Sequence, residues 1–140
     1  MRYEAQVWRF ITPVFLHGSF SHLAGNSLTL LLLGQLVEYD MGSWLFLFFY
    51  LLTGFGGILF SALCSDAISV GASTALFGII GSYAANLILN WTHFKENPNK
   101  RCNILIFLLV SVFLAVGSTA DPRVDQMGHF GGFITGVMSG

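Results

Sequence analysis

Hydrophobic residues run through this chain in long stretches separated by short polar segments. Five stretches are predicted to be helices: Leu23–Val37, Trp44–Leu63, Ala67–Leu89, Asn103–Ala120 and Val124–Gly140. A hydrocarbon core of roughly 30 Å needs about 20 mainly apolar helical residues, and several of the five approach that length. The polar run HFKENPNKR at positions 93–101 is predicted to be a solvated loop. The pattern therefore predicts an all-α bundle of membrane-spanning helices.

The composition agrees with lipid surroundings. Of the 140 residues, 54% are hydrophobic and only 9% are charged, whereas a soluble domain carries about 25% charged residues. Six Lys and Arg with seven Asp and Glu are too few to cover the surface of a small soluble domain. We therefore expect an integral, multi-pass protein of a lipid bilayer. The net charge of −1 argues against nucleic acid as a partner.

Neither cysteines nor histidines form a metal-binding pattern. Cys64 and Cys102 lie at the edges of apolar runs, and no CxxC or Cys/His cluster with zinc-like spacing is present. His17 and His22 are five residues apart, which places them about 140° apart on a helix, so they would face away from each other. We expect no metal and no cofactor.

Four polar residues within or beside the apolar stretches are candidates for function, because polar groups at membrane depth are costly. They are His22, Asn26, Ser73 and His129. His22 and Asn26 are four residues apart, about 40° on one helix face. Their side chains would either bridge helices structurally or donate hydrogen bonds to a ligand.

Ser73 lies in the small-residue segment GASTALFG, near the predicted start of its helix. A helix N-terminus leaves backbone N–H groups free to stabilise a developing oxyanion. Ser and Thr also commonly join membrane helices, so a purely structural role is an alternative. The segment is thus a candidate nucleophile site or a helix contact.

His129 lies in a stripe formed by Gly128, Gly132 and Gly136, which would let its helix approach a neighbour closely. Histidine is the usual base that activates a serine hydroxyl. We find no carboxylate in a span to orient the ring, so packing would have to hold it. A channel or transporter is an alternative, but it would need ionisable groups repeated along a pore, and only His22 and His129 qualify.

Several motifs, in order along the chain, resemble those of the rhomboid family of intramembrane serine proteases. The N-terminal motif resembles the family's WR loop and the H-x-x-x-N helix that follows it, through Trp8, Arg9, Thr12, Phe15, His17, His22 and Asn26. Gly71-Ala72-Ser73 is similar to the G-x-S nucleophile element. His129-Phe130-Gly131-Gly132 with Gly136 looks like the catalytic histidine helix, and Glu38 stands where the family often has glutamate.

The resemblance implies a serine endopeptidase that cleaves transmembrane segments of other membrane proteins. Ser73 would be the nucleophile, and His129 would be the base and then the acid. His22, Asn26 and the backbone N–H of Ser73 would form the oxyanion hole. Gly71 would support the site, and Phe77 is similar to the aromatic residue on which the family's histidine stacks.

The resemblance also implies a rhomboid-like fold of six or more spans, of which about five are present. We expect residues 1–140 to be a single rhomboid-type membrane domain, truncated at both ends. Thr74 departs from the family pattern, which usually has Gly after the serine. Ser73, His129 and Ala72 favour a competent dyad. The alternative is an inactive rhomboid-like protein that binds transmembrane clients for trafficking or quality control.

Overall fold

The computed structural model describes residues 6–66, 68–118 and 124–140, and all regular structure within these ranges is helical. The predicted all-α class is therefore confirmed. The elements are η1 (Val7–Phe10), η2 (Thr12–Phe15), α1 (Phe20–Thr29), the π-helical turn η3 (Leu30–Gly34), α2 (Gln35–Met41), α3 (Ser43–Cys64), α4 (Ser73–Leu89), α5 (Trp91–Glu96), α6 (Pro98–Ser118) and α7 (Gln126–Ser139).

The first predicted span is one continuous helical rod, because α1, η3 and α2 follow each other without a break. This rod, Phe20–Met41, and the next helix, Ser43–Cys64, are both long and apolar enough to cross a membrane, and α4 is a shorter apolar helix. Gly42 joins the two long helices with φ +83°, a conformation that favours glycine. It therefore allows the sharp turn between them.

Large apolar side chains cover the outside of the bundle. Trp44 is 86% exposed, Phe20 85% and Phe113 77%. Further exposed residues are Leu28, Leu31 and Leu32 on the first rod, Leu45, Leu47 and Phe48 on α3, and Ile106, Leu109 and Val110 on α6. Soluble proteins rarely expose contiguous apolar surface on this scale. These helices therefore present lipid-facing surfaces.

Two predicted segments differ from the structure by more than four residues. The segment at 93–101 is not a loop, because α5 and the start of α6 occupy it. Pro98 is the first residue of α6, a position where a missing N–H costs nothing. The third predicted helix begins only at Ser73, and residues 68–72 before it are not helical. Ala67 and Ala120, at the ends of two predicted stretches, lie outside the described residues.

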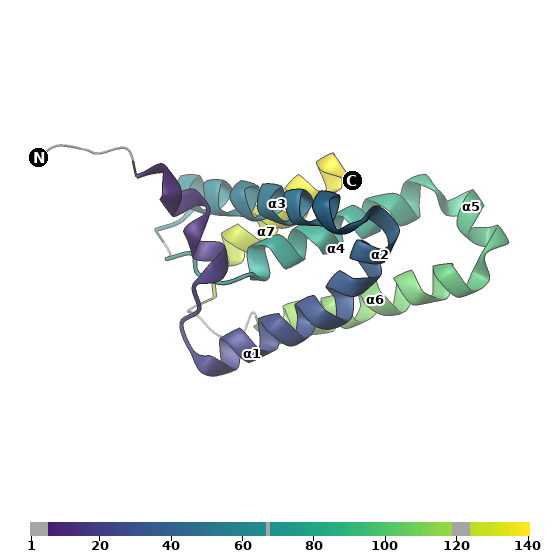
Figure 1. Ribbon diagram of the computed structural model, residues 1–140, viewed down its shortest axis with the longest axis horizontal. Coiled ribbons are helices and arrows are strands. Elements are labelled where there is room, and N and C mark those ends of the chain that lie inside the picture. Colours follow the sequence, from purple (N-terminus) through teal and green to yellow (C-terminus); the bar gives the residue numbers. More distant parts are fainter. Residues whose placement is uncertain (1–5, 67, 119–123) are drawn as a thin grey trace, which may run out of the picture.

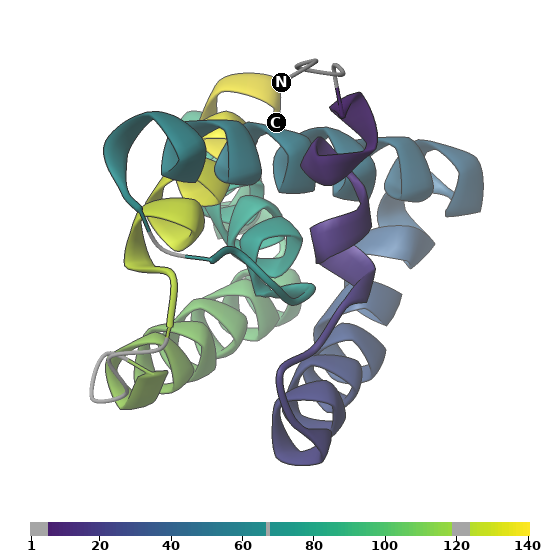
Figure 2. The same ribbon diagram turned by 90° about the vertical axis from the view of Figure 1, so that its left-hand side faces the viewer.

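The centre of the bundle is formed by α3, α4 and α7, which contact one another closely. Figures 1 and 2 show these three helices side by side, with α1 and α6 below α4 in both views. Glycines make the close approach possible. A Cβ added at Gly132 would collide with the carbonyl oxygen of Thr74, and one at Gly136 would collide with that of Gly78. The glycine stripe of α7 therefore lies against α4, which confirms the predicted close approach to a neighbouring helix.

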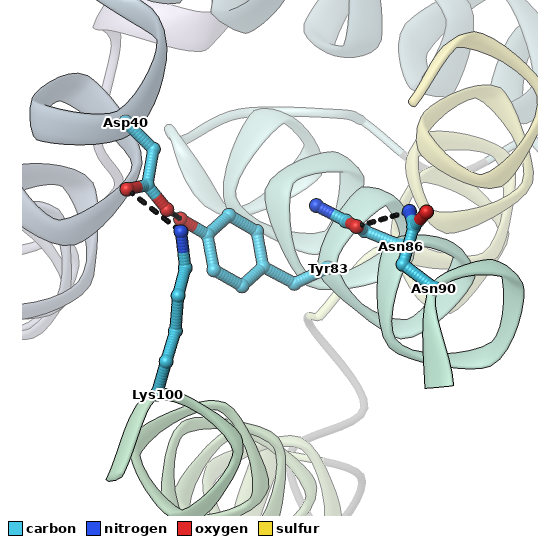
Figure 3. A network of polar contacts seen from close by, with 5 residues as sticks. All are labelled: Asp40, Tyr83, Asn86, Asn90 and Lys100. Atoms are coloured by element: carbon cyan, nitrogen blue, oxygen red, sulfur yellow. Dashed lines mark hydrogen bonds and ion pairs between the residues drawn. The ribbon is translucent and has the colours of Figure 1, made fainter. Parts of the chain in front are cut away.

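A polar network joins the helices at the end of the bundle where α2 and α6 meet. Lys100 of α6 forms an ion pair with Asp40 of α2, with 3.2 Å between Nζ and Oδ1. Tyr83 of α4 donates its hydroxyl to the other oxygen of Asp40 at 3.1 Å. Figure 3 shows Tyr83 and Lys100 converging on this carboxylate. Three helices are thereby linked at one point.

Candidate active site

Three helices begin at the same end of the bundle, and each carries candidate residues in its first turns. In Figure 1 the starts of α1, α4 and α7 all lie towards the left, and Figure 2 views that end directly. His22 and Asn26 lie on α1, Ser73 is the first residue of α4, and His129 lies on α7. The fold thus collects at one end residues that are far apart in the sequence.

The segment before α4 is held in a conformation that requires glycine. Gly71 has φ +118°, which L side chains rarely adopt. Its N–H donates to the carbonyl oxygen of Pro13 in η2 at 2.8 Å. The serine hydroxyl follows two residues later, where α4 begins and its first N–H groups lack acceptors within the helix. Gly71 therefore connects the N-terminal segment to the position of Ser73.

Ser73 and His129 lie within hydrogen-bond distance of each other. Nε2 of His129 is 2.8 Å from Oγ of Ser73. The imidazole stacks on Phe77, one turn after Ser73, with ring centroids 4.2 Å apart and an interplanar angle of 11°. His129 is only 6% exposed, whereas Ser73 is partly accessible. The ring is therefore fixed by packing, and the hydroxyl can be approached.

His22 and Asn26 lie against the backbone next to Ser73. A Cβ added at Gly71 would be 2.8 Å from Nε2 of His22 and 3.1 Å from Nδ2 of Asn26. In the described part of the chain, Nδ2 of Asn26 is buried and has no hydrogen-bond partner. A mainly apolar cavity of about 360 Å³ opens beside it and is lined in part by His17, Asn26 and Ala72. An unpaired buried donor next to a cavity is available to a ligand.

The arrangement combines two chemical capacities at one place. A hydroxyl and an imidazole at 2.8 Å can exchange a proton. An amide donor without a partner can stabilise negative charge on an adjacent oxygen. Thr74 is 2% exposed, and its side chain lies between α3 and α7. The threonine that departs from the family pattern is therefore part of the helix interface.

The two N-terminal histidines do not face away from each other. His17 precedes α1 in a non-helical segment, so the helical angle used in the sequence argument does not apply. Its ring lies edge-to-face with that of His22 at 5.2 Å. Within the described residues, no group of three or more His, Cys, Asp or Glu side chains could hold a metal ion.

Sequence reasoning missed Asp125, a carboxylate close to His129. It is 7% exposed and caps the start of α7, where its Oδ1 accepts a hydrogen bond from the N–H of Gly128 at 2.9 Å. The statement that no carboxylate lies in a span to orient the ring overlooked Asp125, which falls within the predicted stretch Val124–Gly140. An Asp immediately before a helical apolar pattern is an N-cap signal, and this signal would have placed the residue one turn before the histidine.

We expect Gly71→Ala to disrupt the site. The new methyl group would be strained at φ +118° and would lie 2.7 Å from Cε1 of His22. Backbone strain of this kind costs about 1–3 kcal/mol, so the thermal unfolding midpoint and any turnover should both fall. Gly25→Ala is the control, because a Cβ there meets nothing within 4 Å. Equal unfolding midpoints and equal turnover in the two variants would contradict the role of Gly71.

Comparison with known proteins extends the motif argument over almost the whole chain. The Rhomboid domain family matches residues 4–140. RHOMBOID-like protein 5 of Arabidopsis thaliana is 37% identical over 98% of this chain and 44% of its own length. Rhomboid-like protease 3 of Toxoplasma gondii is 40% identical over 94% of this chain and 50% of its own length. Rhomboid-like protease 1 of Toxoplasma gondii is 34% identical over 98% of this chain and 47% of its own length.

The chain spans about half the length of these relatives. Members of the Rhomboid domain family are multi-pass integral membrane proteins and are generally intramembrane serine proteases, which agrees with the lipid-facing surface and the helical fold. The assignment of residues 1–140 to a single domain stays a prediction. With a family match from residue 4 to residue 140 and a polytopic helical bundle, this chain belongs to the rhomboid family.

Proposed function

We propose that the protein is an intramembrane serine endopeptidase that cleaves transmembrane segments of other membrane proteins with Ser73 and His129. The observation that carries the proposal is the 2.8 Å separation between Oγ of Ser73 and Nε2 of His129. The stacking of His129 on Phe77 supports it further, because a base must be held in one orientation to accept a proton efficiently.

In the first half of the reaction, Nε2 of His129 takes the hydroxyl proton while Oγ of Ser73 attacks the scissile carbonyl carbon. The carbonyl oxygen becomes an oxyanion, and Asn26, His22 and the backbone N–H of Ser73 donate to it. His129 then gives the proton to the leaving amine as the C–N bond breaks. Water hydrolyses the resulting ester in the same way, which restores the hydroxyl of Ser73.

Water must reach the site, because it hydrolyses the ester, although the helices around the site face lipid. Polar groups at membrane depth are tolerated where protein or a water-filled cavity surrounds them. Ser73 is partly accessible and lies at the end of the bundle where α1, α4 and α7 begin. A substrate helix would have to unwind locally so that its backbone reaches Ser73, which favours substrates with helix-breaking residues near the cleaved bond.

Labelling with a fluorophosphonate tests the dyad without knowledge of the natural substrate. The probe reacts with serine hydroxyls that an adjacent base activates, so the adduct should map to Ser73 by mass spectrometry. His129→Ala should abolish the labelling, and His93→Ala, which changes an exposed histidine outside the site, should leave it unchanged.

Two outcomes would count against the proposal in different ways. Labelling of Ser73 that persists in His129→Ala would remove His129 as the base. Absence of labelling in the folded wild-type protein would favour the alternative, a rhomboid-like protein that binds transmembrane clients without cleaving them.

A further inference from the structure

Asp125 is a buried carboxylate that the proposed dyad does not use. One of its oxygens, Oδ1, caps α7 through the N–H of Gly128 at 2.9 Å. The other, Oδ2, is buried and has no hydrogen-bond partner in the described part of the chain. Keeping a charged oxygen buried and unpaired is costly, and a neutral N-cap such as Asn or Ser would avoid that cost. The cap alone therefore does not account for the charge.

The carboxylate lies in the interface directly behind the dyad. A Cβ added at Gly128 would collide with Oδ2 of Asp125 and would lie 2.9 Å from Cγ2 of Thr74. The side chains of Asp125 and Thr74 thus both lie against Gly128, between α4 and α7. Thr74 directly follows Ser73, and Gly128 directly precedes His129. Asp125 therefore packs against the residue that precedes His129, on the side where the residue that follows Ser73 also packs.

His129 is within the electrostatic reach of two titratable side chains, Asp125 at the start of its own helix and His22 on α1. Nδ1 of His129 is buried and has no hydrogen-bond partner among the described residues. Transfer of the serine proton to Nε2 would make the ring a cation in a site of low dielectric constant. In such a site a nearby negative charge stabilises the imidazolium of His129, and a protonated His22 would destabilise it.

We propose that Asp125 is a positioning residue for His129. Its Oδ1 fixes where α7 begins, and its negative charge stabilises the imidazolium that forms during proton transfer. The inference rests on the proposed function, because the charge has this role only if His129 accepts the proton of Ser73. Asp125 acts through His129 and does not contact the substrate.

Asp125→Asn separates the charge from the cap, because the amide oxygen can still accept from Gly128 while the negative charge is lost. The full-length protein, reconstituted in liposomes, would be assayed for cleavage of a reporter transmembrane substrate, and its thermal unfolding would be measured in parallel. We expect kcat to fall about tenfold or more, with KM and the unfolding midpoint unchanged. Asp125→Ala should lower kcat and also the unfolding midpoint, since it removes the cap as well. Asp66→Asn, at an exposed carboxylate, is the control.

The outcomes separate this inference from the proposed function. Wild-type turnover in Asp125→Asn would overturn the inference and leave the dyad intact, whereas no cleavage by the wild-type protein would overturn the proposed function itself. If the Asn variant does not fold, Asp125→Ser, which also keeps a capping oxygen without the charge, replaces it. Loss of folding in both variants would also overturn the inference, because the negative charge of Asp125 would then be required for folding.

Discussion

Ser73→Ala is expected to abolish cleavage of a reporter transmembrane substrate by the reconstituted full-length protein. The substitution removes only the hydroxyl oxygen that lies 2.8 Å from Nε2 of His129. In a soluble serine protease the loss of the nucleophile costs roughly 10⁶-fold in kcat, which would place the residual rate below detection. Cleavage products separated by electrophoresis and identified by mass spectrometry would measure the effect.

Ser82→Ala is the matched control for this experiment. Ser82 lies on the same helix, α4, and is 6% exposed, so it is a buried serine of that helix outside the site. We expect it to retain turnover close to that of the wild-type protein. Cleavage by Ser73→Ala at the wild-type rate would exclude the proposed nucleophile, and equal loss in both variants would indicate damage to the fold.

Asn26→Ala is expected to lower kcat by about 10²–10³ with little change in KM. Nδ2 of Asn26 is buried without a hydrogen-bond partner in the described residues, so it costs free energy in the resting protein. That cost is recovered only when an acceptor arrives. An oxyanion is a stronger acceptor than the substrate carbonyl, and removal of the donor should therefore affect the transition state more than substrate binding.

Initial rates over a range of reporter substrate concentrations in liposomes would separate kcat from KM. Asn86→Ala is the control, because Asn86 lies near the other end of α4 from Ser73, where its side chain accepts a hydrogen bond from Asn90. A rise in KM with unchanged kcat would assign Asn26 to substrate binding. Loss of folding in Asn26→Ala alone would assign it a structural role in the contact between α1 and Gly71.

The sequence by itself determined the surroundings and class of this protein. Helices with too few charged residues to cover a water-exposed surface need lipid around them, and the composition alone shows that the charged residues are too few. The start of the third helix was less well predicted, because a small-residue, uncharged run reads as apolar whether or not it is helical. The helical character of positions 93–101 was also missed, since α5 and α6 draw stability from tertiary contacts, such as Arg101 lying over the ring of Trp91 at 5.5 Å.

The candidate residues were named from motifs, but only the tertiary structure decided which side chains meet. Ser73 and His129 are 56 positions apart, and their approach depends on glycines of α7 lying against carbonyl oxygens of α4. Local periodicity shows that such a stripe exists and does not show which helix it contacts. The same holds for Asp125, whose burial behind the dyad arises from the crossing of α4 and α7. Long-range packing, which no local pattern encodes, therefore assembles the site.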